Sequence, residues 1–340
     1  MGSRRPPAVA RVLTRVTATV REHGFFAPGD TVLVSVSGGP DSVCLLYALW
    51  HLRRLLRIRL EAFTFDHRLR DDSATDVAYV RRVCSRLRVP CHPRVATDAP
   101  ARGASVEAWA TTARMQAAHD VRREIGAATV AEAHTLDDQA ETVLLNLVRG
   151  SGLDGLAGIW PGERGAALVQ PLLAVTREEV ESFCRALHLR PRRDPMNEDR
   201  RYLRTAIRLD VLPALEAATG RGVAATIART ADNLRADRRE LVEATVRAAD
   251  GVVERTPGGE LRFDAAGLRA LSPPLAARVV RWGVFNLLAT DEAPWSKPAT
   301  DAILDLAEGR PGRRRDLADG RVARRDRTQV VVERGLESRG

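Results

Sequence analysis

The chain is built around one stretch near its N-terminus, residues 31–49, where an apolar run, a turn with two glycines and a second apolar run follow one another. Thr31–Val36 is short and rich in valine, which is typical of a strand buried on both faces of a parallel sheet. From Pro40 onward the apolar residues recur with the period of a helix. The stretch therefore predicts a strand, a tight turn and a helix.

The turn has the composition of an anion-binding loop, Ser37-Gly38-Gly39-Pro40-Asp41-Ser42. Two residues without a Cβ let successive amide groups converge on an anion, and a proline in the first helical turn directs the positive end of the helix to the same point. A phosphate group is the expected ligand, and a turn without any ligand is the alternative. The phosphate loop that carries a lysine before serine or threonine does not occur in this sequence.

The rest of the N-terminal half alternates short apolar runs with helical patterns. We expect strands over 60–65, 89–95 and 128–133, and helices over 8–23, 71–87, 105–125 and from 134 to near 150. This alternation predicts an α/β fold with a doubly wound parallel sheet. Ligands of such sheets bind at the carboxyl ends of the strands. Polar clusters follow three of the predicted strands, at Ser37–Ser42, Asp66-His67 and His134–Glu141, and we expect them to converge.

The length of the chain and the change in its residue pattern after about Gly220 indicate more than one domain. With 340 residues, of which 44% are hydrophobic, the chain can form two cores. We assign residues 1–215 to a catalytic domain, 216–250 to a long connecting helix and 251–340 to a smaller mixed domain. In the last of these, Asp319-Gly320 between two arginine-containing runs predicts a hairpin.

Charge and cysteine content narrow the classes of partner and cofactor. The formal net charge of +9 favours a polyanionic partner such as nucleic acid, although Lys297 is the only lysine and nearly all the cations are arginine. The four cysteines form no C-x-x-C pair, which argues against metal or iron–sulfur ligation and for reduced thiols. No apolar run reaches membrane-spanning length, so we expect a cytoplasmic protein that is not bound to a membrane. The sequence leaves a homodimer open.

Further polar motifs follow the loop in a fixed order. They are Asp66-His67-Arg68-Leu69-Arg70, Ser105-Val106-Glu107, Ala133-His134-Thr135, Asp137-Asp138-Gln139-Ala140-Glu141-Thr142, Gly150-Ser151-Gly152, Gln170-Pro171-Leu172, Asp194-Pro195 and Asn197. Together with the loop, this series resembles the tRNA(Ile)-lysidine synthase family of the N-type ATP pyrophosphatases, over about residues 30 to 215.

The resemblance implies an ATP-dependent ligase on a sheet of the PP-loop type. ATP is cleaved between its α and β phosphates, the wobble cytidine of the CAU anticodon of tRNA(Ile) is adenylated, and free L-lysine displaces AMP to give lysidine. ATP and Mg²⁺ are the implied cofactors. The smaller domain of the family holds the body of the tRNA.

The resemblance also assigns roles to single residues. The residues that it implies for ATP binding are Ser37, Gly38, Gly39, Pro40, Asp41, Ser42, Asp66 and His67. Because Mg²⁺ prefers oxygen ligands, Asp41 and Asp138 are the expected metal ligands. These two carboxylates, with His134 and Arg114, form the expected catalytic set. The lysine substrate is expected at Asp137 and Glu141, which lie one helical turn apart; structural roles such as helix capping are the alternative for each of these side chains.

Two arginine groups are candidates for RNA binding. Arg200, Arg201, Arg204 and Arg208 recur at helical spacing and predict a basic face. The arginine-rich tail Arg313–Arg327 predicts a second one, with Arg313, Arg314 and Arg315 as its named candidates. A solvated charged surface is the alternative for both groups.

Some positions depart from the family pattern. Thr64 stands where relatives usually have histidine, Thr111 and Met115 replace an arginine and a tyrosine, and Ala206 stands where a basic residue is common. These differences leave open a catalytically impaired protein that binds tRNA. A tRNA thiolase or another enzyme of the same ATP pyrophosphatase class is the second alternative, although a cluster-dependent thiolase needs paired cysteines. Synthetases that act on small nucleotides would not need the basic second domain.

Overall fold

The structure is a computed structural model that describes residues 5–69, 73–101, 103, 105–192, 200–287, 296–317 and 320–334. Arg70, Asp194, Pro195 and Asn197 of the motif series lie outside the described residues, as does the side chain of Glu107. The chain divides into two compact units, residues 1–235 and 236–340. The division falls inside the predicted connecting segment.

The first unit contains a five-stranded parallel sheet with the strand order β3-β2-β1-β4-β5. The strands are β1 Thr31–Ser35, β2 Arg59–Asp66, β3 Cys91–Val95, β4 Thr129–Ala131 and β5 Leu168–Val169. The doubly wound parallel sheet predicted from the sequence is therefore confirmed. The two-residue strand β5 has no counterpart among the predicted strands, because so short a run carries no periodic signal.

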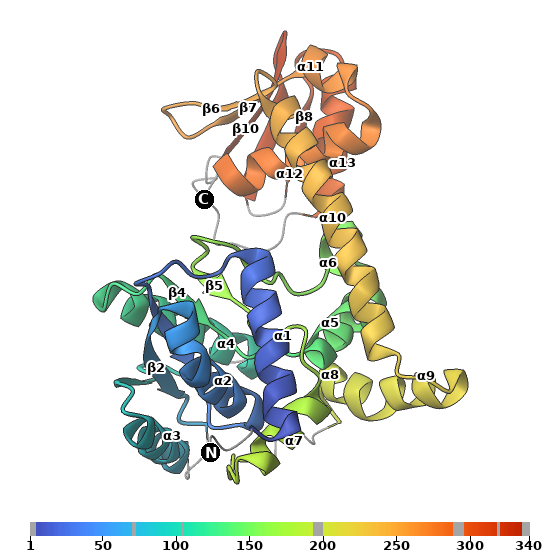
Figure 1. Ribbon diagram of the computed structural model, residues 1–340. Helices are drawn as coiled ribbons and strands as arrows, with labels where there is room; N and C mark the ends of the chain where they lie inside the picture. The colour runs from blue at the N-terminus through green and yellow to red at the C-terminus, as the bar shows by residue number, and fades with distance from the viewer. Residues whose placement is uncertain are drawn as a thin grey trace. The chain divides into compact units, whose positions relative to one another are not determined.

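Helices cover both faces of this sheet. They are α1 Pro7–His23, α2 Pro40–Leu56, α3 Ser73–Leu87, α4 Val106–Glu124, α5 Leu136–Val148, α6 Leu153–Leu156 and α7 Arg177–Ala186. Along β1, Val32 and Val34 face a core that α1, α2, α3 and α7 complete, whereas Leu33 packs with residues of α4. Figure 1 shows α1 and α2, both in blue, packed side by side. Burial on both faces explains why β1 is apolar without alternation.

The basic segment after residue 200 is less regular than one helix. It forms α8 Leu203–Ala206, a π-helical segment η2 Ile207–Val211 and α9 Leu212–Thr219. Pro213 lies at the start of α9, where a missing amide hydrogen is tolerated. The long helix α10 Ala224–Ala249 then begins later than the predicted residue 216. No helix within the described ranges is both long and apolar enough to cross a membrane.

The second unit contains an antiparallel sheet with the strand order β6-β7-β10-β9-β8 and its own core. The elements are β6 Val253–Arg255, β7 Leu261–Asp264, α11 Ala265–Ala270, α12 Pro273–Leu287, α13 Lys297–Glu308, β8 Arg314–Asp316, β9 Arg321–Arg325 and β10 Gln329–Arg334. Pairing of β8 with β9 confirms the predicted hairpin, and Asp319 of the predicted motif lies outside the described residues.

Candidate active site

The glycine loop connects the carboxyl end of β1 to the start of α2. The hydroxyl of Ser42 organises it, since Oγ accepts from the amides of Ser37 and Gly38, each at 3.2 Å, and donates to the carbonyl of Gly39 at 3.0 Å. Gly38 has φ of 95°, a conformation that a side chain would strain. The loop is thus held in a fixed conformation by its own serine, with the start of α2 directed at it.

Asp41 lies in the first turn of α2 and is half-buried, with its Oδ1 atom out of contact with solvent. Its Oδ1 has no hydrogen-bond partner among the residues that the structure describes. The pKa of Asp41 is raised to about 6, first by burial and then by the negative charge of Asp138, against the opposing effect of Arg177 and Arg208. Because Asp138 affects the pKa of Asp41, the glycine loop and the start of α5 lie near each other. Two of the three predicted polar clusters therefore converge.

The start of α5 is fixed by a capping box. The Oδ2 atom of Asp138 accepts from the amide and the hydroxyl of Thr135, both at 2.8 Å, and Oγ1 of Thr135 accepts from the amide of Asp138 at 3.3 Å. Asp138 therefore completes the capping box of α5 and also lies near enough to Asp41 for its charge to raise the pKa of that carboxyl. Its other oxygen, Oδ1, accepts from the guanidinium groups of Arg177 at 3.3 Å and Arg204 at 3.2 Å.

Three arginines surround the carboxylate of Glu141, whose side chain is fully buried. Arg208 donates from Nε and Nη2 at 2.7 and 2.8 Å, Arg204 from Nε at 3.0 Å and Arg177 from Nη1 at 3.1 Å. Burial alone would raise the pKa of Glu141, but these guanidinium groups hold it below its usual range. We call Asp138, Glu141, Arg177, Arg204 and Arg208 the acid–arginine cluster.

The acid–arginine cluster corrects the predicted basic face. Arg204 and Arg208 turn inward to the carboxylates of α5 instead of forming an exposed surface with Arg200. Arg200 is exposed and pairs with Asp210 at 3.3 Å, and Arg201 is exposed. Helical spacing predicted that Arg204 and Arg208 share a face, but it could not tell which side of the segment packs on α5.

The same contacts bear on the predicted lysine site. Both oxygens of Glu141 already accept from arginines, so in this arrangement the carboxylate offers no face to a lysine ammonium group. Asp137 is half-buried, and its Oδ2 accepts from the amide of Arg177 at 2.8 Å. Of the two carboxylates assigned to lysine, Asp137 is the one that the structure leaves accessible, and its role stays a prediction.

A second polar group lies at the ends of β1 and β4. Arg114 of α4 donates from Nη1 to Oε1 of the buried Glu132 at 2.6 Å and to Oγ of Ser35 at 3.4 Å. Nδ1 of His134 lies 3.1 Å from Oε1 of Gln170, and 3.9 Å from Oε2 of Glu132. Burial would raise the pKa of Glu132, but Arg114 and His134 lower it overall. Arg114 therefore has a structural partner, and its catalytic role remains a prediction.

The remaining predicted ATP ligands lie at the same edge of the sheet. Asp66 ends β2, the neighbour of β1, and its Oδ1 accepts from the amide of Arg68 at 2.8 Å. The ring of His67 packs edge to face against Phe65 and Trp109. Both residues occupy the edge that the sequence predicted, and their contact with a nucleotide stays a prediction.

The carboxylates of the site fit a Mg²⁺ ion in part. The unsatisfied oxygen of Asp41 and the neighbouring charge of Asp138 form the kind of oxygen-rich, acidic environment that Mg²⁺ selects, usually together with phosphate oxygens of the substrate. Within the described ranges no three histidine, cysteine or acidic side chains gather as a complete metal site. A bound ion would therefore rely on Asp41, on Asp138 and on oxygens from ATP.

Sequence reasoning missed two members of the site. Arg177 begins α7 directly after the capping residue Thr176, and its side chain contacts both acids of α5. A basic residue in the first turn of a helix, where acids are favoured, was a usable signal. Glu132 was also missed, although a carboxylate inside the apolar run 128–133 indicates a buried partner.

The remaining predicted residues and departures are distributed more widely. Arg314 and Arg315 are exposed on β8, with Arg314 paired to Asp316 at 3.1 Å, and Arg313 precedes them. Thr64 is buried in β2, Thr111 is exposed, and Met115 and Ala206 are half-buried. The structure thus leaves the RNA role of the tail as a prediction.

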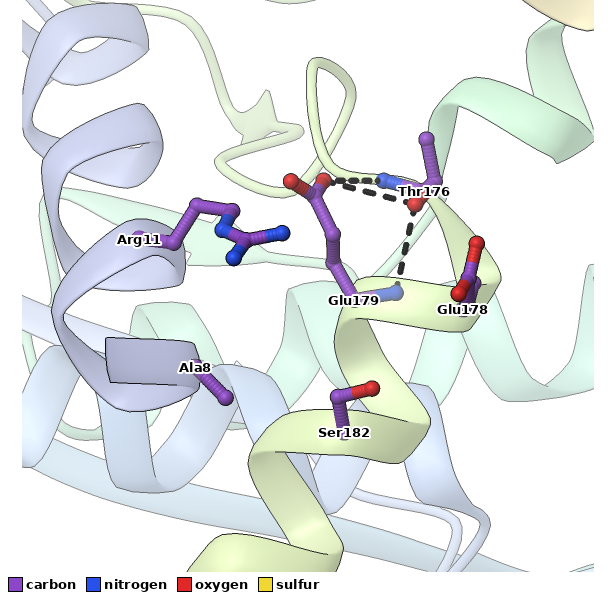
Figure 2. A pocket seen from close by; sticks show the side chains of 6 residues that line it. All are labelled: Ala8, Arg11, Thr176, Glu178, Glu179 and Ser182. Carbon is purple, nitrogen blue, oxygen red and sulfur yellow. Dashed lines mark hydrogen bonds between the residues drawn. The ribbon is translucent and has the colours of Figure 1, made fainter. Parts of the chain in front are cut away.

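A surface cavity of about 270 Å³ lies between α1 and α7 and contains none of the predicted site residues. Ala8, Arg11, Thr176, Glu178, Glu179 and Ser182 line it. Figure 2 shows Glu179 directed at Thr176, where its Oε2 accepts from the amide at 3.0 Å and from the hydroxyl at 3.3 Å. These groups complete a second capping box, so the cavity has a structural explanation.

Comparison with solved structures supports the fold of the first unit. The chain is similar to the U34-tRNA thiolase NcsA from Methanococcus maripaludis, which was solved with its [4Fe-4S] cluster. The TM-score is 0.57 at 17% sequence identity, with 67% of this chain and 79% of that chain covered. At this identity the similarity concerns the fold alone.

Comparison of sequences identifies the family. Residues 9–215 match the model of the PP-loop domain. The tRNA(Ile)-lysidine synthase of Salinispora arenicola is 37% identical over 341 residues, which cover 98% of both chains. That of Symbiobacterium thermophilum is 37% identical over 313 residues, but the match spans only 63% of its length and 86% of this chain. The chain therefore belongs to the tRNA(Ile)-lysidine synthase family of PP-loop proteins.

Proposed function

We propose that this protein is an ATP-dependent ligase that joins L-lysine to the wobble cytidine of the CAU anticodon of tRNA(Ile). The observation that carries the proposal is the convergence of the glycine loop with the acid–arginine cluster at one edge of the sheet. Relatives named for this activity, one of them covering 98% of this chain, support the choice of substrate.

The first step forms a bond between the 2-carbonyl oxygen of cytidine and the α phosphorus of ATP, and it releases pyrophosphate. The leaving group carries negative charge, which amides at the start of α2 and the guanidinium groups near the loop are placed to neutralise. Mg²⁺, held by Asp41 and Asp138, would supply further charge neutralisation. Arg177 and Arg208 lie close enough to Asp41 to affect its pKa, so they are candidates for contact with the phosphates.

The second step transfers lysine. The ε-amine attacks C2 of the cytosine ring, the bond between C2 and its oxygen breaks, and AMP leaves with that oxygen. The ammonium form must first lose a proton, a task that we assign to His134. Its Nδ1 faces the Oε1 acceptor of Gln170, which leaves Nε2 as the basic nitrogen. Asp137 binds the lysine cation, while Glu141 holds the arginines of the cluster in place.

The test is mass spectrometry of tRNA with a CAU anticodon after incubation with ATP and lysine, together with measurement of pyrophosphate release. We expect the mass of lysine minus water to be added to the anticodon, and pyrophosphate release to require the tRNA. A binding protein without catalysis would retain tRNA affinity with no mass change. Formation of ADP in place of AMP would contradict the proposed chemistry.

A further inference from the structure

The second unit contains a surface cavity of about 300 Å³ at one end of its antiparallel sheet. The turn between β6 and β7, the first residue of β9 and the last residues of β10 form its wall. Arg255, Gly258, Gly259, Glu260, Arg321, Val332, Glu333 and Arg334 line it. Arg321 belongs to the arginine-rich tail 313–327 that the sequence indicated, whereas Arg255 and Arg334 lie outside it.

Three arginines of this cavity share one face of the sheet. Arg321 of β9 lies directly opposite Arg334 of β10, and Arg255 of β6 lies opposite Leu261 of β7. Residues that oppose one another in an antiparallel pair project to the same face. Leu261 in turn opposes Val332 of β10, two residues before Arg334, so all three arginines lie on the face that carries the core of the unit. Like charges in direct opposition destabilise a strand pair.

Arg321 is the most unusual of the three. It is 7% exposed, and no hydrogen bond or ion pair of its guanidinium group occurs within the described part of the chain. A guanidinium group that is largely buried and has no protein partner must be paired with water or with a ligand. Arg325, at the other end of β9, is equally buried but donates to the carbonyls of Asp326 and Gln329. Of these two arginines of β9, Arg321 is therefore the one whose guanidinium group is left to solvent or to a ligand.

The acids of the cavity do not neutralise it. Glu260 accepts from Arg262 at 2.9 Å, and Glu333 accepts from Arg324 at 3.2 Å. Arg262 and Arg324 lie on the opposite face of the sheet, by alternation along β7 and β9. Both carboxylates are therefore committed to other guanidinium groups, and the cavity keeps an excess of positive charge. Beside Gly259 the surface is open, which lets a ligand approach the backbone.

We propose that this cavity binds one backbone phosphate of the tRNA, with Arg321 as its central ligand and with Arg255 and Arg334 beside it. The identity of the RNA rests on the proposed function. A phosphate oxygen accepts two N–H groups of one guanidinium group, and its charge removes the repulsion between Arg321 and Arg334. Arg321 thus positions the RNA and does not take part in the reaction.

The test compares full-length Arg321→Gln with the matched control Arg247→Gln. Arg247 lies on α10 in the second unit and is 69% exposed, and its replacement removes the same charge. Binding of CAU-anticodon tRNA is measured at several salt concentrations. For Arg321→Gln we expect about fivefold weaker binding, a slope of log K against log salt that is smaller by about 1, and a melting temperature no lower than that of the wild type. Arg247→Gln should change affinity and slope less.

Different failures separate the two proposals. Unchanged affinity and slope in Arg321→Gln would overturn the phosphate site, even where the wild type forms lysidine. Loss of thermal stabilisation by inorganic phosphate in Arg321→Gln, with unchanged tRNA binding, would identify a site for free anions and would also overturn it. Conversely, a wild type that binds tRNA through Arg321 but forms no lysidine would retain this site and reject the proposed function.

Discussion

Asp41 combines burial with an oxygen that has no partner in the described part of the structure. We predict that Asp41→Asn lowers pyrophosphate release at least about 100-fold, because a metal ligand next to the leaving group is lost. The affinity for tRNA should stay within a few fold, since a carboxylate does not attract RNA. The free energy of unfolding should not fall, because the variant removes a charge whose burial raises its pKa to about 6. Assays of pyrophosphate release, tRNA binding and urea unfolding test these points.

The choice of Asp41 for this experiment follows from its contacts. Asp138→Asn should also abolish adenylation. Because Asp138 caps α5 and accepts from two arginines, this variant would lower both the rate of adenylation and the stability of the fold, and the two effects could not be separated. Asp41→Asn has no such hydrogen bonds to break on Oδ1. Wild-type lysidine formation in both variants would remove these carboxylates from the mechanism.

Arg114 forms an ion pair with the buried Glu132, and variants of this pair can distinguish a structural role of Arg114 from a catalytic one. We predict that Arg114→Met lowers the free energy of unfolding by roughly 3 kcal/mol, because the buried carboxylate of Glu132 loses its arginine partner and keeps only weaker contacts with His134 and Gln170. The double variant Arg114→Met, Glu132→Gln should recover most of this loss. Urea unfolding measures it. Recovery of stability without recovery of activity would assign Arg114 to the reaction, whereas recovery of both would make its role structural.

The pH dependence of the same variants has a defined sign. In the wild type the folded pKa of Glu132 lies below the unfolded value, because Arg114 and His134 outweigh the effect of burial. Its stabilisation is therefore present above about pH 4.5 and is lost as the pH falls through the folded value. In Arg114→Met burial dominates, so the carboxyl should instead destabilise the fold as the pH rises. Unfolding from pH 4 to 7, compared with the double variant, shows the reversal.

At the level of elements, the acid–arginine cluster joins α5 to α7, α8 and η2. We predict that Glu141→Gln increases amide exchange across residues 203–211 by at least tenfold, because three half-buried guanidinium groups lose the charge of their shared, fully buried carboxylate. Hydrogen–deuterium exchange measures this change. Asp210→Asn is the control, since its ion pair with Arg200 is exposed and contributes little. Unchanged exchange in Glu141→Gln would show that the apolar contacts of Ile207 hold the segment instead.

At the level of the whole molecule, each unit has its own core. We predict that a saturating ATP analogue raises the melting temperature of one calorimetric transition and leaves the other unchanged, because the glycine loop belongs to the first unit alone. Ligand at 100 times its dissociation constant stabilises the unit that binds it by about 2.7 kcal/mol. Gly38→Ala is the control, since a side chain at its φ of 95° strains the loop. A single transition that shifts as a whole would show that the units unfold together.

The sequence motifs predicted the type of fold and site more accurately than they predicted which side chains contact each other. Thr31–Val36 and the loop that follows were readable because a buried strand and a glycine turn leave local signals, and the predicted strands agree with the observed ones to within a few residues. The two-residue β5 and the break of the basic segment into α8 and η2 left no such signal. Arg204 and Arg208 were consequently placed on a basic surface, although the structure pairs them with Glu141.

Residues 31–42 by themselves determined a buried strand, a phosphate loop and the start of a helix, because backbone conformation there depends on side chains that are neighbours in the chain. The alternation of strands and helices up to residue 150 determined the parallel sheet. Tertiary structure alone decided which charges face each other. Arg177 lies 36 residues from Glu141, and Arg321 lies opposite Arg334 only through the register of two strands. The free energy of a buried charge depends on partners brought close by folding, so its role follows from the packed structure.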